Sequence, residues 1–302
     1  MFLTSPLEII LVPTLMIILG YALKRQGVLK SGDSVVLSKI VLDVTLPSLI
    51  FVNLAAANIT HDMLFLPVTA FIVSGVCIVL SYMFCKLRGY SKVKTWTIMI
   101  ASSMMNTGFL GFPITIGVFG YDGFLYAIFY DLETTLLFVI FGMVLVGVFG
   151  GNRREVLKQS LTFVPLWAVI LAFVFNFFNL QYGVVIENML NYLGQATIPL
   201  IMITMGLRLD FKEIRHSIGD SLFVSLVTLI IAPLVVYLIL GFVGLNKLAF
   251  NVAVLEAGMA TAMNALVLSI NYDLDIKLMS SMIFTNTVLA LFTLTGLIYF
   301  LL

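Results

Sequence analysis

The most constraining feature of the sequence is a nearly unbroken succession of apolar runs. Hydrophobic residues make up 61% of the 302 residues and charged residues only 10%, which is far from the balance of soluble domains. The runs approach the roughly 20 residues that cross a bilayer as an α-helix, and they lack the alternation of a transmembrane β-strand. They cover residues 6–23, 35–57, 63–85, 95–119, 123–148, 161–179, 184–207, 217–243, 248–271 and 277–301. The sequence therefore predicts an all-α integral membrane protein with ten transmembrane helices.

The basic residues are distributed unevenly between the connections of these helices. Of the 16 Lys and Arg residues, only Lys247 borders an even-numbered connection. Because cytoplasmic connections are enriched in Lys and Arg, we expect the odd-numbered connections in the cytoplasm and both termini outside. The expected protein is a multi-pass protein of the cell membrane. Its expected surroundings are the lipid bilayer, with no nucleic-acid partner, and a homodimer is left open.

Several motifs recur after 152 to 158 residues. The matching positions are Pro13 with Pro165, Pro47 with Pro199, Met105–Asn106 with Met263–Asn264, and Phe129–Asp131 with Phe284–Asn286. Five helices in each half is an odd number, so the second half must enter the membrane from the opposite side, as in many transporters. We predict a first five-helix repeat at 1–148, a cytoplasmic hinge loop at 149–160 and an inverted second repeat at 161–302.

A helix-breaking run, Asn106–Pro113, interrupts the fourth predicted helix. Gly108 and Gly111 weaken a helix, and Pro113 lacks a backbone N–H and clashes with the carbonyl four residues earlier. Backbone groups freed at membrane depth must be buried in protein or line a wet cavity. The run is therefore either a packed kink or a binding site. For the second interpretation, the expected substrate contacts are Asn106, Thr107, Gly108, Gly111, Pro113, Met263 and Asn264.

Four carboxylates fall inside predicted helices: Asp43, Asp131, Glu133 and Glu256. Such residues are rare in membranes and are functional candidates by default. No Lys or Arg lies at comparable depth, so these acids must be protonated, hydrated or bound to a cation. Glu256 is the first candidate to hold Na⁺ or a transferable proton, followed by Asp131 and Asp43, unless local hydrogen bonds neutralise it. Asp131 and Glu133 are two residues apart and point to different helix faces.

These motifs carry a family resemblance. Asn106–Ile114, followed by Gly120, resembles the fourth-helix signature of the auxin efflux carrier family. Met259–Ala265 with Asn271–Asp273 is similar to its second signature, and Thr45–Phe51 resembles its second helix. The family includes plant auxin exporters and bacterial permeases for small carboxylates such as malate and malonate. The likeness covers the whole chain.

The resemblance implies two inverted five-helix repeats, as in bile acid sodium symporters, with a scaffold domain and a transport domain. It also implies that helices four and nine are broken and cross near the membrane midplane. The short hinge is similar to that of the bacterial members. Ala260 stands where the family usually has proline, so the ninth helix would owe its break to Gly258 and Asn264 alone.

The expected function is secondary transport of a small organic anion by alternating access. An anion needs positive potential, and no buried Lys or Arg is expected to provide it. The N-termini of the half-helices would provide it instead. No cofactor is expected beyond Na⁺ or H⁺ as coupling ion. The alternatives are a channel or a sensing subunit with the same fold, and an enzyme built on Asp131 and Glu133. No Walker, His-Glu-x-x-His or Gly-x-Ser-x-Gly motif occurs in the chain, so we expect no enzyme.

Overall fold

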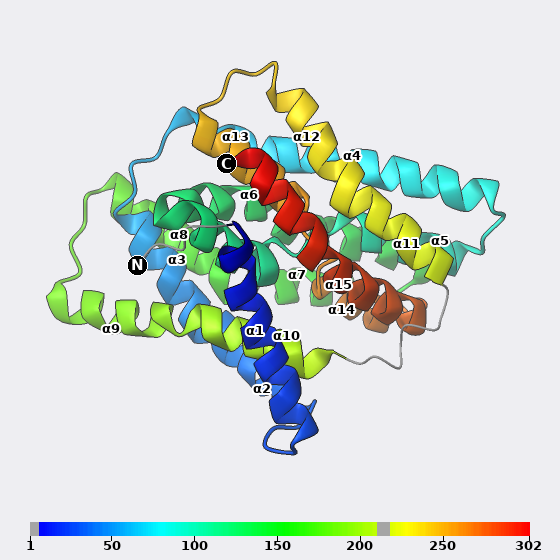
Figure 1. Cartoon of the computed structure of the whole chain (residues 1–302), viewed down its shortest axis with the longest axis horizontal. Helices are drawn as coiled ribbons and strands as arrows, with labels where there is room; N and C mark the ends of the chain where they lie inside the picture. The colour runs from blue at the N-terminus through cyan, green and yellow to red at the C-terminus, as the bar shows by residue number, and fades with distance from the viewer. Residues whose placement is uncertain (1–5, 210–217) are drawn as a thin grey trace. The chain divides into compact units, whose positions relative to one another are not determined.

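The computed structural model describes residues 6–209 and 218–302, and within these ranges the chain is helical (Figure 1). The α-helices are α1 (Pro6–Arg25), α2 (Asp33–Ile40), α3 (Leu46–Ala55), α4 (His61–Leu87), α5 (Lys92–Ser103), α6 (Phe112–Phe149), α7 (Arg153–Leu161), α8 (Val164–Phe177), α9 (Val184–Gln195), α10 (Thr197–Arg208), α11 (Ile218–Leu226), α12 (Ala232–Leu240), α13 (Lys247–Ala257), α14 (Asn264–Asn271) and α15 (Ile276–Leu301). Three π-helical turns join them: η1 (Val41–Thr45), η2 (Thr107–Gly111) and η4 (Val227–Ile231). Two of the basic residues on the predicted odd-numbered connections, Lys212 and Arg215, lie outside the described residues.

Several of these helices can cross a membrane. Six in the described ranges are long and apolar enough: Asp33–Ala55, His61–Leu87, Thr107–Phe149, Val184–Arg208, Ile218–Leu240 and Ile276–Leu301. A seventh is added if the bent pair Arg153–Gln159 and Val164–Phe177 counts as one span. The chain is therefore a helical multi-pass membrane protein, whereas the number ten stays a prediction. Part of the difference lies at Gly120, where a positive φ of 67° turns the chain inside the 43-residue segment.

Three prolines begin helices directly after a π-helical turn. Pro47 is the second residue of α3 after η1, Pro113 of α6 after η2, and Pro233 of α12 after η4. A proline cannot donate to the carbonyl four residues earlier and its ring pushes that carbonyl away, and a wider π turn accommodates both effects. Pro113 therefore does not itself interrupt a helix, contrary to the prediction from the sequence. The non-helical residues precede it.

The described chain divides into two compact units that both draw on the two sequence halves. Unit 1 comprises Met1–Ile10, Thr60–Leu157 and Asp210–Leu302, and unit 2 comprises Leu11–Ile59 and Lys158–Leu209. Much of the predicted hinge loop at 149–160 belongs to helix α7, which runs to Leu161. These units do not coincide with the two predicted sequence repeats, which stay a prediction.

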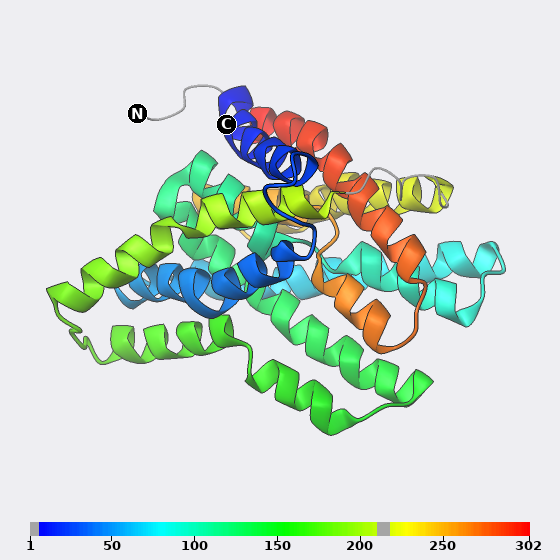
Figure 2. The same ribbon diagram turned by 90° about the horizontal axis from the view of Figure 1, so that it is seen from below.

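Unit 2 is held together by close helix packing. Its α3 packs against both α8 and α9 (Figure 2). The Asn176 side chain on α8 donates to the carbonyls of Leu54 and Ala57, at 3.2 and 2.7 Å, and so satisfies backbone groups at the end of α3. Gly20 on α1 and Gly206 on α10 face each other so closely that a Cβ on either would overlap with the other helix backbone. Small residues of this kind allow such approach in membranes.

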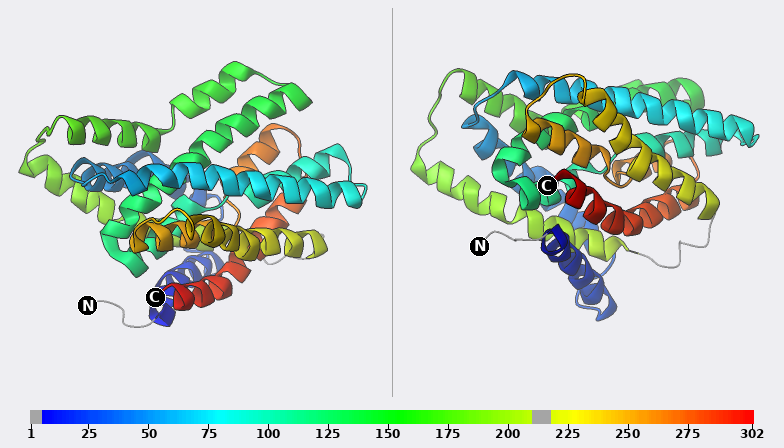
Figure 3. Two further views of the ribbon diagram at one scale, coloured as in Figure 1. Left: turned by 90° about the horizontal axis from the view of Figure 1, so that it is seen from above. Right: turned by 45° about the horizontal axis from the view of Figure 1, so that its top comes forward.

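Unit 1 is built around the long helix α4, which packs against α5, α6, α12 and α13 (Figure 3). The start of α11 is tied to the α4–α5 connection through a buried carboxylate. Tyr90 donates to Asp220 at 2.7 Å, and Lys94 pairs with the same carboxylate at 2.8 Å. The hydrogen bond to Asp220 raises the pKa of the Tyr90 hydroxyl. This polar contact holds the N-terminal end of α5. The C-terminal end of the same helix enters the candidate functional site.

Candidate functional site

The first break separates α5 from η2. Helix α5 ends at Ser103 and the next helical turn begins at Thr107, so three residues between them are non-helical. Asn106 caps the new turn, because its side-chain oxygen accepts a hydrogen bond from the backbone N–H of Phe109 at 3.3 Å. Asn is among the preferred residues at this position. The sequence motif therefore starts a helix as well as ending one.

The second break separates α13, which ends at Ala257, from α14, which begins at Asn264. Gly258 to Met263 are non-helical, so the ninth predicted helix is fully interrupted even with alanine at position 260. Glycine at 258 allows the approach of Leu297, whose Cδ2 would lie only 2.9 Å from a Cβ there. A proline is thus not required for the break.

The two breaks cross and bond to each other. Met105 and Thr261 form an antiparallel bridge. The N–H of Asn106 donates to the carbonyl of Ala260, and the N–H of Ala262 donates to the carbonyl of Met104, both at 2.7 Å. Backbone groups that leave a helix need partners in a buried apolar setting. Each break therefore supplies the partners that the other lacks, all within unit 1.

The predicted substrate contacts lie in this crossover. Gly108, Met263 and Asn264 are partly exposed. The remaining predicted contacts are buried, namely Asn106, Thr107, Gly111 and Pro113. Both η2 and α14 begin here, and the first N–H groups of a helix have no partner within it. The exposed part of the crossover thus combines helix N-termini with the amide side chain of Asn264.

Glu256 reaches from the second arm to the first. It is fully buried, and its Oε1 accepts a hydrogen bond from Thr115 on α6 at 2.6 Å. Its Oε2 has no hydrogen-bond partner among the described residues. A Cβ on Gly111 would overlap with this carboxylate, so glycine at 111 provides the space that Glu256 occupies. Thr115 is a site residue that the sequence analysis missed.

The other predicted carboxylates lie in different surroundings. Asp131 on α6 is partly exposed and accepts a short hydrogen bond from Thr107. Glu133 is buried, and its Oε2 accepts from Thr134 at 3.4 Å. Asp43 is exposed and belongs to unit 2, whereas Asp131, Glu133 and Glu256 belong to unit 1. No cluster of three or more His, Cys, Asp or Glu side chains that could hold a metal occurs in the described ranges.

A second polar contact occupies the corresponding position of the predicted repeat. Asn286 on α15 donates to Thr261 in the second break and to Thr228, both at 2.8 Å. Thr107 and Thr261 are 154 residues apart, and Asp131 and Asn286 are 155 apart. Each break is therefore held by a threonine bonded to an acid or an amide on a following helix. The sequence pairing of positions 131 and 286 was the signal for this contact, but the two threonines were not recognised.

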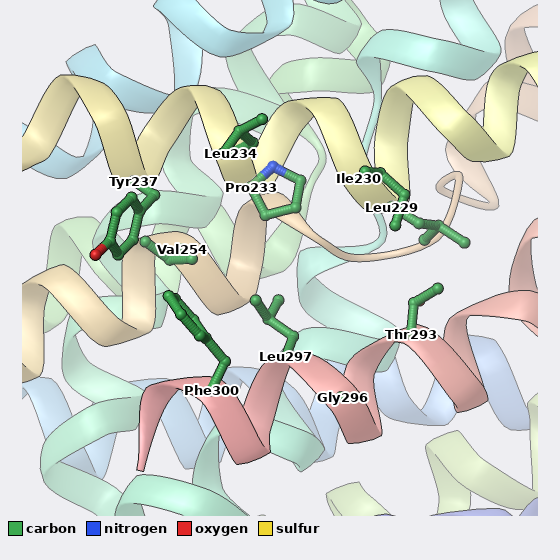
Figure 4. Close-up of a pocket in the computed structure, with 10 residues that line it drawn as sticks. All are labelled: Leu229, Ile230, Pro233, Leu234, Tyr237, Val254, Thr293, Gly296, Leu297 and Phe300. Atoms are coloured by element: carbon green, nitrogen blue, oxygen red, sulfur yellow. The ribbon is translucent and has the colours of Figure 1, made fainter.

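Unit 1 also contains an apolar pocket of about 430 Å³ (Figure 4). Its lining comes from η4, α12, α13 and α15: Leu229, Ile230, Pro233, Leu234, Tyr237, Val254, Thr293, Gly296, Leu297 and Phe300. None of these residues is ionisable at neutral pH. A small anion would lose its hydration there without gaining a partner, so the pocket is not the expected anion site.

Comparison with known proteins agrees with this architecture. The model of a family described as membrane transport protein matches residues 7–152 and 153–298. An uncharacterized transporter of Methanothermobacter thermautotrophicus is 42% identical over 95% of both chains. An uncharacterized transporter of Methanocaldococcus jannaschii is 32% identical over 95% of this chain and 96% of its own. A Rhizobium meliloti protein named "Putative malonate transporter" is 28% identical over 38% of this chain and 36% of its own. The chain therefore belongs to the membrane transport protein family, the auxin efflux carrier family that its fourth-helix motif resembles.

Proposed function

We propose that the protein is a secondary transporter that moves a small organic anion across the cell membrane by alternating access, with the crossover as its substrate site. The observation that carries the proposal is the pair of helix breaks that bond to each other inside a protein of a transport family. Broken helices of this kind form substrate sites in many secondary transporters. Two inverted repeats and both termini outside are parts of the same proposal. The match of the family model in two stretches supports the repeats.

A small carboxylate is the substrate class that suits these groups. Helix N-termini favour anions through their free N–H groups and dipole, and Asn106 and Asn264 add amide donors. No described Lys or Arg side chain is buried, so the site would hold one or two negative charges by dipoles instead of by salt bridges. The name of the Rhizobium meliloti relative supports malonate as the first compound to test.

Glu256 is the proposed coupling residue. Its unpartnered Oε2, the Thr115 hydroxyl and the carbonyls released at the second break are hard oxygen ligands, the type that Na⁺ or a proton would use. Under this proposal, uptake depends on a sodium or pH gradient, and the Glu256→Gln variant loses that dependence more than it loses substrate binding.

Removing either crossover amide should weaken substrate binding. Loss of a hydrogen bond to a charged ligand costs about 1.5 to 3 kcal/mol, or roughly tenfold to 150-fold in affinity. We expect this loss for Asn106→Ala and Asn264→Ala when malonate and other carboxylates are titrated in a thermal-shift assay, followed by uptake into proteoliposomes. Asn53→Ala is the control, because that amide donates only within its own helix, to Leu49 at 2.7 Å. Unchanged affinity in both crossover variants would place the site elsewhere.

The orientation is tested by thiol labelling in intact cells. The native Cys77 and Cys85 are buried and free, so background labelling should be low. A cysteine introduced at His61 should react with an impermeant reagent added outside. Cysteines introduced at Arg154 or at Arg215, which lies outside the described residues, should react only after the cells are opened. Equal labelling at His61 and Arg154 would reverse the proposed topology.

A further inference from the structure

Four side chains form a continuous line through the first break. Thr107 Oγ1 contacts Asp131 Oδ1 on one side and Thr134 Oγ1, at 3.2 Å, on the other. Thr134 Oγ1 in turn lies 3.4 Å from Glu133 Oε2. Asp131 and Glu133 point to different faces of α6, yet two hydroxyls connect their carboxylates. One end of the line is partly exposed at Asp131, and the other is buried at Glu133.

The number of hydrogens in this line is restrictive. Three contacts need three hydrogens, and each threonine hydroxyl supplies one. The third must come from a carboxyl group. If Asp131 is protonated, it donates to Thr107, Thr107 donates to Thr134, and Thr134 donates to Glu133. If Glu133 is protonated instead, all three donors reverse direction. One proton, with a total charge of minus one, satisfies the line in both states.

We propose that Asp131 and Glu133 share one proton through Thr107 and Thr134, and that this relay passes the proton between a partly exposed and a buried position. In each transfer a carboxyl O–H breaks at one end, an O–H forms at the other, and each hydroxyl exchanges one hydrogen for another. The two contacts of Thr134, at 3.2 and 3.4 Å, are long for hydroxyl hydrogen bonds. A small movement of Thr134 therefore connects or disconnects the relay.

The groups around the relay favour a single shared proton. Those that interact with its two acids are Ser74 and Cys77 on α4, Tyr130 on α6 and Glu256 on α13. None is a cation, and no described Lys or Arg side chain is buried. Two negative charges in this setting would repel each other without compensation. Glu133 Oε1 and the Tyr130 hydroxyl also have no hydrogen-bond partner among the described residues, so the buried end has further acceptors for a proton.

The second break provides the contrast. There the amide of Asn286 bonds to Thr228 and Thr261, and Thr261 donates to the carbonyl of Ala101 at 2.7 Å. Every group in that network is neutral, so no titratable proton is needed. The relay is thus confined to one of the two corresponding positions. Thr228 supplies a matched control, since it is a buried threonine bonded to an amide instead of an acid.

The shared proton is tested without any substrate. Infrared spectra of the purified protein in detergent at neutral pH report protonated carboxyl groups through their C=O band. The double variant Asp131→Asn with Glu133→Gln should lower the integrated band by the equivalent of one carboxyl group. Loss of none or of two groups would overturn the proposal. A protonated Glu256 would contribute to the same band, so Glu256→Gln is measured alongside and as a background for the double variant.

A second experiment rests on the proposed transport function and uses malonate as the probe. In proteoliposomes that contain a pH-sensitive dye, Thr134→Val should reduce malonate-driven proton movement at least tenfold while leaving malonate binding unchanged. Thr228→Val should reduce neither. Equal proton movement in wild type and Thr134→Val would refute the relay. If malonate and other carboxylates are not transported at all while the infrared band loses one group, the transport proposal fails and the shared proton stands.

Discussion

Gly206→Val is expected to yield little folded protein, because it separates two helices that now touch through their backbones. A Cβ on Gly206 would lie 2.7 Å from the backbone nitrogen of Tyr21 and 2.9 Å from the Cα of Gly20. These are backbone atoms, so the clash cannot be relieved by a side-chain rotation. Overpacking of this kind costs about 3 kcal/mol or more, which changes a folding equilibrium by more than about 100-fold. The measurement is the yield of monodisperse protein and its thermal unfolding in detergent.

Gly75→Val is the control for this prediction. Gly75 lies in the middle of α4, and a Cβ there would meet no atom within 4 Å. The same glycine-to-valine change should therefore be tolerated. If Gly206→Val folded as well as Gly75→Val, the close contact between α1 and α10 would not contribute to the stability of unit 2.

Gly111→Ala is expected to abolish the gradient dependence of transport by displacing a carboxylate that lies far away in the sequence. The added methyl group would occupy the place of the Glu256 carboxylate. Glu256 must then rotate away and lose its 2.6 Å hydrogen bond from Thr115, at a cost of about 1 kcal/mol or more. Uptake should respond to a sodium or pH gradient no more than in Glu256→Gln, and thermal unfolding should occur at lower temperature.

The steric cause can be separated from a general effect of alanine. Gly147→Ala, on α6 at a position with no neighbour within 4 Å, should behave like the wild type. Adding Glu256→Ala to Gly111→Ala should restore thermal stability, because it removes the overlapping atoms, but not the gradient dependence. Such non-additivity is the signature of residues in direct contact. Strictly additive effects on stability would show that Gly111 and Glu256 do not share this space.

The sequence was informative where local chemistry decides the structure. The glycines and proline after Asn106 located the first break to within a few residues. The second break was implied by the family resemblance and attributed to Gly258 and Asn264, which flank it. The repeat analysis paired positions 131 and 286, which both bond to a break, but it predicted no such contact. The prediction of proline as the breaking residue was wrong at Pro113, because a π turn can absorb the missing hydrogen bond and let the proline begin a helix.

The partners of the acids could not be predicted from spacing. Thr115 and Glu256 are 141 residues apart, so their contact depends on how the two breaks cross. Periodicity correctly separated Asp131 and Glu133 onto different faces, yet it could not show that Thr107 and Thr134 would connect them. Asp43 illustrates the opposite error. Its depth in a predicted span suggested a buried site, whereas the helix turns it outward in unit 2.

The two backbone hydrogen bonds between the breaks restrict how the protein can move. Asn106 donates to the carbonyl of Ala260, and Ala262 donates to the carbonyl of Met104. Pulling the crossover apart would leave four backbone groups without partners, at several kcal/mol for each where water is excluded. We therefore expect the two breaks to stay bonded to each other and to transmit displacement from one arm to the other. Under the proposed function, a substrate held there would change sides through movement of the surrounding helices, while the geometry of the crossover stays constant.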